Sequence, residues 1–171
     1  MKNTVLYVIG FLLLLGFVAP QNQSYITHVD TEYILSKIPA YQDAQKQLED
    51  LAAQYRAEID AKVREVDSLF KVYQENEVLM TPEMKMRLKN EIMQKDKQVK
   101  ELQKKYFGPD GLLAKKREEL LKPIMDNIYK AVSDIAEQTH ADYVFDKATG
   151  EILYANPQND QSDLVLRKLG Y

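Results

Sequence analysis

Cysteine is absent from the 171 residues of this chain. Its absence excludes disulfide bonds, a thiolate zinc site, a thiol nucleophile and a lipid attached to an N-terminal cysteine. Histidine is scarce as well, and the two present, His28 and His140, have no spacing that binds a metal. The chain also lacks a glycine-rich phosphate loop, a nucleophile elbow and a paired-histidine motif. The sequence therefore predicts no enzyme activity, no metal site and no cofactor.

Neither sign of charge is in large excess. The chain has 23 basic and 26 acidic residues, which gives a formal net charge of −3. Proteins that bind nucleic acid usually carry a basic face that neutralises phosphates. This composition therefore does not predict nucleic acid as a partner.

The chain also lacks an apolar run long enough to span a membrane comfortably. Its longest apolar stretch, Val5–Val18, has 14 residues and includes Gly10 and Gly16, whereas a spanning helix needs about 20. A short apolar run that follows Lys2 and precedes a polar segment is typical of a secretory signal peptide. We therefore expect residues 1–22 to direct export and to be removed, with retention as an uncleaved anchor as the alternative.

Two long segments with the spacing of coiled-coil helices occupy the middle of the chain. Residues 41–77 carry apolar or small side chains at intervals of three and four, and residues 82–107 continue this rhythm. The first segment has nine acidic and five basic residues, whereas the second has four acidic and eight basic residues. Opposite charges favour antiparallel packing. Residues 39–107 are therefore predicted to form a helical hairpin arm, with its tip near 77–82.

A second helical segment follows the arm. Residues 108–140 begin with Gly108-Pro109-Asp110-Gly111, which is a strong signal for a turn. The helical period then resumes and continues past Pro123, where we expect a kink or a fresh helix start. These residues are predicted to form a return helix.

The β-forming segments lie at the two ends of the chain. Residues 23–38 contain a predicted strand and a short helix, and residues 141–171 a predicted β-hairpin, from Asp142–Asp146 and Glu151–Ala155, before a C-terminal helix. Three short strands bury too little apolar surface to offset the entropy of ordering them. Exposed strand edges also attract further strands. We therefore expect several copies to join their strands into one sheet or barrel, without fixing the number of copies.

Several short segments, taken in order, carry a family resemblance. Near the N-terminus they are Ile26–Leu35, Ile38-Pro39 and Gln47–Glu49, and near the C-terminus Asp142–Lys147, Ile152–Pro157 and Asp163–Gly170. Together with the apolar start and the central hairpin, they make the chain resemble the Skp/OmpH periplasmic chaperones, in the form common among flavobacteria-like relatives. The resemblance extends over essentially the whole chain after the apolar start.

This resemblance implies an α+β, mostly α fold: a long antiparallel hairpin arm that projects from a small β-barrel body completed by trimerisation. Three arms would enclose a cavity that holds unfolded outer-membrane proteins in the periplasm without ATP. Weak contact with anionic lipid is also implied, although the acidic net charge of this chain departs from family members with basic arm tips. The residues that would join the copies in the barrel are Tyr25, Ile26, Val29, Val144, Phe145, Ile152, Leu153 and Tyr154.

Two groups of residues on the arm are candidates for client binding. The first is apolar and lies at the tip: Val78, Leu79, Met80, Met84 and Met86. Methionine is adaptable and suits varied partners, but these side chains could equally close the hairpin turn. The second group is Lys95, Lys97 and Lys100, which could hold acidic clients or instead pair with the acidic first segment.

Two other functions remain compatible with the sequence. A structural coiled-coil adaptor, tethered by an uncleaved N-terminus, would space other envelope proteins. A prefoldin-like cytosolic chaperone shares the plan of barrel and hairpin, but the export signal argues against it.

Overall fold

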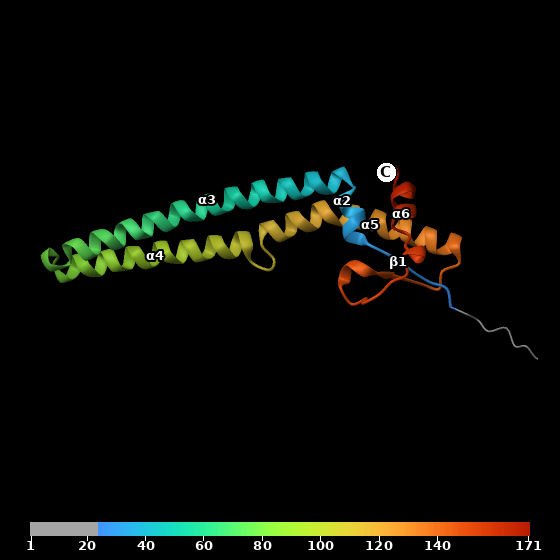
Figure 1. Ribbon diagram of the computed structural model, residues 1–171. Helices are drawn as coiled ribbons and strands as arrows, with labels where there is room; N and C mark the ends of the chain where they lie inside the picture. The colour runs from blue at the N-terminus through green and yellow to red at the C-terminus, as the bar shows by residue number, and fades with distance from the viewer. Residues whose placement is uncertain (1–23) are drawn as a thin grey trace, which may run out of the picture.

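The computed structural model describes residues 24–171, and the predicted signal peptide at 1–22 lies outside them. A long helical hairpin extends from a small body that contains a short sheet and the last helix (Figure 1). Within the described residues, no helix has both the length and the apolar character that crossing a membrane requires. The molecule is thus mostly helical, and the long axis of the hairpin dominates its shape.

The arm consists of α3 (Pro39–Asn76) and α4 (Pro82–Phe107), joined by a 3₁₀ turn at Glu77–Leu79. Both helices begin with proline in their first turn, where its missing N–H group costs nothing. The Thr81 hydroxyl accepts a hydrogen bond from the Met84 amide at 3.2 Å and caps α4. The chain therefore reverses at the tip that the sequence predicts.

The two arm helices meet along a narrow apolar seam. Its buried centre is Ile59 on α3 with Val99 and Tyr106 on α4, and the ring of Tyr106 stacks on Tyr55 with centroids 4.0 Å apart. Aromatic pairs of this kind add to the energy of apolar burial. The seam buries only a stripe of each helix, so most arm side chains remain in solvent.

The return helix α5 (Leu112–Thr139) starts after a sharp turn and packs against the first half of α3 (Figure 1). Both glycines of the turn are required by close contacts: a Cβ on Gly108 would collide with the Lys104 carbonyl oxygen, and one on Gly111 would lie 2.8 Å from the Tyr106 oxygen. The helical assignment of α5 continues unbroken through Pro123. A fresh helix start there, one of the two expected outcomes, is therefore wrong.

The sheet of the body has two strands, β1 (Ile26–Val29) and β2 (Tyr143–Asp146), which run parallel. The predicted β-hairpin is wrong, because Glu151–Ala155 forms no strand and β2 pairs with β1 instead. Parallel pairing needs a long connection between the strands, and the whole helical excursion supplies it. After β2, a 3₁₀ turn capped by the Asp146 side chain turns the chain away from the sheet.

The core of the body lies where the C-terminal half of α5 meets β1, α2 (Thr31–Ser36) and α6 (Ser162–Leu169). Its most buried side chains are Ile34, Ile128 and Val165. Val29 belongs to this core, with only 4% of its surface exposed. Val29 therefore packs inside its own subunit and leaves no surface for a partner, contrary to its assignment to the contacts between copies.

Candidate functional site

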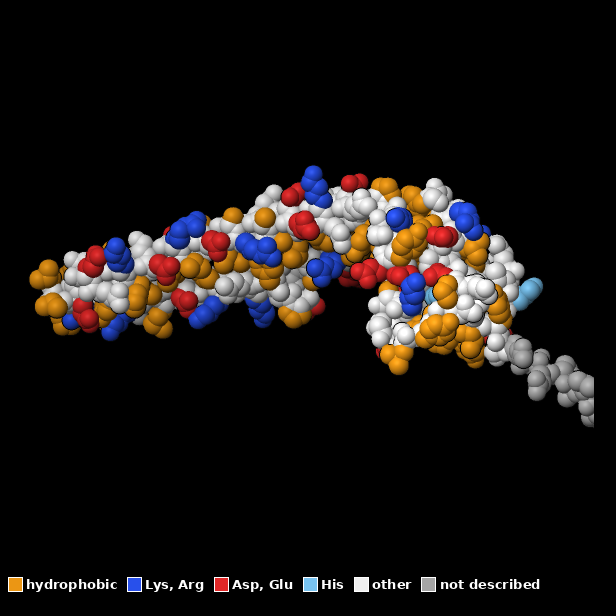
Figure 2. All heavy atoms as spheres, viewed as in Figure 1, with side chains coloured by type: hydrophobic (Ala, Val, Ile, Leu, Met, Phe, Trp, Pro, Cys, Tyr) orange, Lys and Arg blue, Asp and Glu red, His pale blue; other side chains and the backbone are white. Residues whose placement is uncertain are grey.

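The tip of the arm exposes apolar side chains that the hairpin turn does not need. Val78 and Leu79 are 95% and 83% exposed. The turn is instead closed by the backbone hydrogen bond from the Met80 amide to the Glu77 carbonyl and by the Thr81 cap. Figure 2 shows hydrophobic side chains gathered at this end of the arm. The side chains of Val78 and Leu79 therefore do not hold the turn closed.

The three tip methionines differ in their surroundings. Met80 is partly covered, whereas Met84 and Met86 are exposed on α4. Met93 is also exposed and lies seven residues, or two turns, after Met86, so both occupy one face of α4. This face points away from the seam, to which α4 contributes Val99 and Tyr106. We did not predict Met93 from the sequence, although its spacing of seven residues from Met86 indicates that both lie on one face of the helix.

The predicted lysines are all paired within the arm. Lys95 lies beside the seam and reaches Glu65 of α3 at 3.0 Å. The other two pair with acids one turn away on their own helix: Lys97 with Glu101 at 3.8 Å and Lys100 with Asp96 at 2.6 Å. The structure therefore separates Lys95 from the other two, and it offers none of the three as an isolated charge.

The Glu65 carboxylate on α3 is the acceptor of the ion pair that joins the two arm helices. It takes hydrogen bonds from Lys62 on its own helix and from Lys95 across the seam. These bonds lower the pKa of Glu65. The other ion pairs of α3 and α4 form within one helix, so within the described residues the opposite charges of the two segments contribute one direct ion pair.

The outer face of the sheet exposes three apolar side chains, whereas His28 on the same face is buried. Register pairs Ile26 with Tyr143 and His28 with Phe145, and paired residues of a parallel sheet point to the same side. Ile26, Tyr143 and Phe145 are each about half exposed on this face, and Tyr25 adjoins them. Val144 points the other way and packs against the core. The structure thus brings together three of the eight residues predicted to join copies, Tyr25, Ile26 and Phe145, and adds Tyr143, which was not predicted.

The loop after β2 carries three more residues of that predicted set. Leu153 is fully exposed, Tyr154 is 81% exposed and Ile152 is partly covered. The hydrophobic side chains on the lower side of the body in Figure 2 lie over β2 and this loop. The single chain therefore leaves two groups of apolar side chains in water, on the sheet face and at the loop tip.

A cluster of ionisable side chains lies at the base of this loop. The Lys147 ammonium lies 2.9 Å from Asp160 and 3.5 Å from Asp30, and His28 Nε2 lies 3.5 Å from Asp160. Partial burial raises the pKa of Asp160, but hydrogen bonds from Ser162 and Lys147 outweigh it and lower the value to about 2. Sequence reasoning missed this cluster, because its members come from three segments that are far apart in the sequence.

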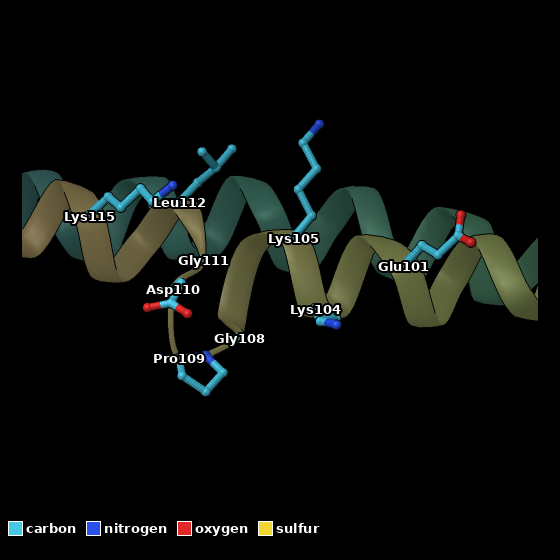
Figure 3. Close-up of a pocket in the computed structure, with 9 residues that line it drawn as sticks. All are labelled: Glu101, Lys104, Lys105, Gly108, Pro109, Asp110, Gly111, Leu112 and Lys115. Atoms are coloured by element: carbon cyan, nitrogen blue, oxygen red, sulfur yellow. The ribbon is translucent and has the colours of Figure 1, made fainter.

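A hollow of about 430 Å³ lies beside the turn between α4 and α5. Figure 3 shows that the side chains of Lys104, Lys105 and Asp110, three of its charged residues, point in different directions. Residues 24–171 contain no group of three or more histidine or acidic side chains placed to bind a metal.

Comparison with known proteins finds a matching family and a similar structure. A family model described as "Outer membrane protein (OmpH-like)" matches residues 25–169. A crystal structure of a candidate outer membrane chaperone (OmpH-like) from Caulobacter crescentus CB15 has the same fold, with a TM-score of 0.64 and 12% sequence identity, over 90% of this chain and 88% of that one. No curated protein sequence matches the chain. Because the family match extends over nearly all described residues, this chain belongs to the OmpH-like family.

Proposed function

We propose that this protein is a periplasmic holding chaperone, which binds unfolded outer-membrane proteins without ATP and prevents their aggregation. Membership of the OmpH-like family supports a role as a chaperone. The observation that carries the proposal is the long arm with Val78 and Leu79 exposed at its end. A solvent-exposed apolar tip at the far end of a stiff hairpin can reach an unfolded chain without burying itself in the body.

Weak and distributed contacts suit this task. Exposed apolar side chains at the tip and on the outer face of α4, such as Met86 and Met93, offer shallow contacts to many different sequences. Several such contacts together bind a client through high effective concentration, while each single contact breaks easily. A client can therefore leave without an energy source.

The proposal includes a homotrimer joined through the bodies. The uncovered sheet face and the exposed Leu153 and Tyr154 support self-association, because each copy would otherwise leave both surfaces in water. Joining copies would place several arms around one space and so multiply the contacts to a client. The family resemblance supports three copies and a closed barrel, and the apolar start of the chain supports export with removal of residues 1–22.

The test is suppression of aggregation. A urea-unfolded β-barrel protein is diluted into buffer without ATP, and light scattering is followed with and without this protein. We expect scattering to fall in its presence. Unchanged scattering would contradict a holding chaperone and would favour the structural adaptor.

The tip can be tested in the same assay. Changing Val78 and Leu79 to Ser removes two apolar side chains that make no structural contact in the turn, so we expect folding to be kept and the amount of protein needed for half suppression to rise about threefold or more. Gln94→Ser with Gln98→Ser is the matched control, since both side chains are exposed and polar. If V78S/L79S suppresses aggregation as well as the control, the tip does not bind clients.

A further inference from the structure

The loop between β2 and α6 is closed at its base and unpacked at its tip. Lys147 and Asp160 form its base, and their charged groups lie 2.9 Å apart. Between them, Leu153 is fully exposed and Tyr154 nearly so. Compact surface loops normally pack their own side chains inside the loop. This loop instead holds its ends together and directs its two largest apolar side chains into solvent.

The base is connected to the rest of the body by further polar contacts. Asp160 accepts hydrogen bonds from the Ser162 amide and hydroxyl, at 2.9 and 2.5 Å, and that hydroxyl also accepts from the Asp30 amide at 2.8 Å. The backbone of Asp160 forms an isolated parallel bridge with His28 of β1. The ion pair therefore joins the loop to β1 and to the start of α6.

Both members of the pair are charged near neutral pH. The hydrogen bond to Asp160 raises the pKa of Lys147, and hydrogen bonds to Asp160 outweigh its partial burial and lower its own pKa. Each group sits in a partly covered position, with 37% and 25% of the side chain exposed. A partly desolvated, hydrogen-bonded pair holds its geometry better than an ion pair in open water.

We infer that the Lys147–Asp160 ion pair is a clip that positions Leu153 and Tyr154 for contact with a second copy of this chain. The inference rests on the proposed function, in which copies join through their bodies. Lys147 and Asp160 are thus positioning residues for assembly, and Leu153 and Tyr154 make the contact. A loop fixed in its bound conformation before contact loses less entropy when it binds, which strengthens the association.

In this assembly, the loop tip of one copy contacts the outer sheet face of a neighbouring copy. The exposed side chains on the outer face of β1 and β2 are Ile26, Tyr143 and Phe145. They are apolar, as are Leu153 and Tyr154 at the loop tip. Loop tip and sheet face are different surfaces of one subunit, so a contact between them joins copies head to tail. Contacts of this kind close into a ring when the rotation allows it, as a trimer requires.

The experiment is a double-mutant cycle on self-association. The dissociation constant between copies is measured by sedimentation velocity over a range of concentrations for the purified protein and for K147M, L153S and the double variant. We expect K147M and L153S each to raise this constant about tenfold or more, because one loses pre-organisation and the other loses the contact. In the double variant, K147M should raise the constant by a smaller factor than it does in the parent protein, because L153S has already removed part of the contact that the clip positions.

Two control variants and one further readout accompany the cycle. K147R keeps a cation at the base and should restore assembly, and K115M removes an exposed lysine that forms no ion pair within residues 24–171 and should change nothing. Hydrogen exchange of the backbone amides at 150–156 should be faster in K147M than in the parent protein. In L153S it should be unchanged at the same monomer concentration.

The outcomes separate the clip from the assembly itself. If the parent protein is monomeric at all concentrations, both the assembly and the clip are wrong. If it assembles and K147M assembles equally well, the clip alone is wrong. Additive effects in the double variant, or loss of the helical circular dichroism signal in K147M, would also overturn the inference, because Lys147 would then support the fold and not the loop.

Discussion

Thr27 shows how one buried side chain of β1 can work against stability. Only 1% of its surface is exposed, and its hydroxyl has no hydrogen-bond partner within the described part of the chain. A buried unpaired hydroxyl costs about 1–3 kcal/mol. We therefore expect Thr27→Val to raise the free energy of unfolding by about 1 kcal/mol, measured by urea denaturation.

The neighbouring threonine of the body provides the matched control. The Thr31 hydroxyl donates to the Asp146 carboxylate at 2.6 Å, so Thr31→Val removes a partnered group and leaves an acceptor unpaired. We expect this variant to lower the free energy of unfolding by about 1 kcal/mol or more. Equal effects of the same sign at both positions would contradict the account of Thr27.

The Asp160 carboxylate makes stability depend on acid pH. Its pKa in the folded protein is about 2, below the ordinary value of 3.8. The unfolded state therefore binds the proton more tightly, and the stabilisation from Asp160 is complete above about pH 4 and lost as the pH falls toward 2. In Asp160→Asn we expect a smaller loss of stability between pH 5 and pH 3 than in the parent, measured by urea denaturation at each pH. The same slope in both proteins would contradict this.

At the scale of elements, the turn between α4 and α5 depends on Gly111. A Cβ at this position would lie 2.8 Å from the Tyr106 oxygen and 2.9 Å from Gly108 atoms, which are backbone groups that cannot rotate away. We expect Gly111→Ala to lower the free energy of unfolding by about 1–3 kcal/mol, because the turn must distort to admit the methyl group. Thermal unfolding of the variant measures this change, and Pro109→Ala, in the exposed part of the same turn, is the control. A Gly111→Ala protein as stable as the control would contradict the close packing.

The arm helices could be predicted from the sequence because their signals are local. Intervals of three and four mark the seam, and Thr81 with Pro82 marks the start of α4, so each signal lies within one or two turns of the residues it determines. The face that holds Met93 follows from the same period. The partners of the lysines could not be predicted from this period, because the ion pair between Lys95 and Glu65 depends on how the two helices align.

The body could be predicted only in part because its contacts join distant segments. β2 was found as a strand, but its partner is β1 across the entire arm and not the segment Glu151–Ala155 beside it in sequence. The cluster of Lys147 and Asp160 likewise needs the fold before its members meet. A β-forming composition at Glu151–Ala155 shows that a segment is apolar, but not whether it pairs or remains an exposed loop.

At the scale of the whole molecule, the subunit is a stiff arm attached to a small body with uncovered apolar surfaces. The arm has a narrow seam and an exposed tip, and the body has its core on one side of the sheet only. The apolar side chains of the outer sheet face and of the loop tip remain in water in the single chain. Assembly through the bodies would cover these surfaces and leave the tips free for clients.

Native mass spectrometry of the protein mixed with an unfolded outer-membrane β-barrel protein tests this claim most directly. We expect one dominant complex, with the mass of three copies of the chain without its first residues and one copy of the client, in buffer without ATP. The control is the same client in its folded form, which should not bind. Single copies of the chain beside aggregated client would contradict the account.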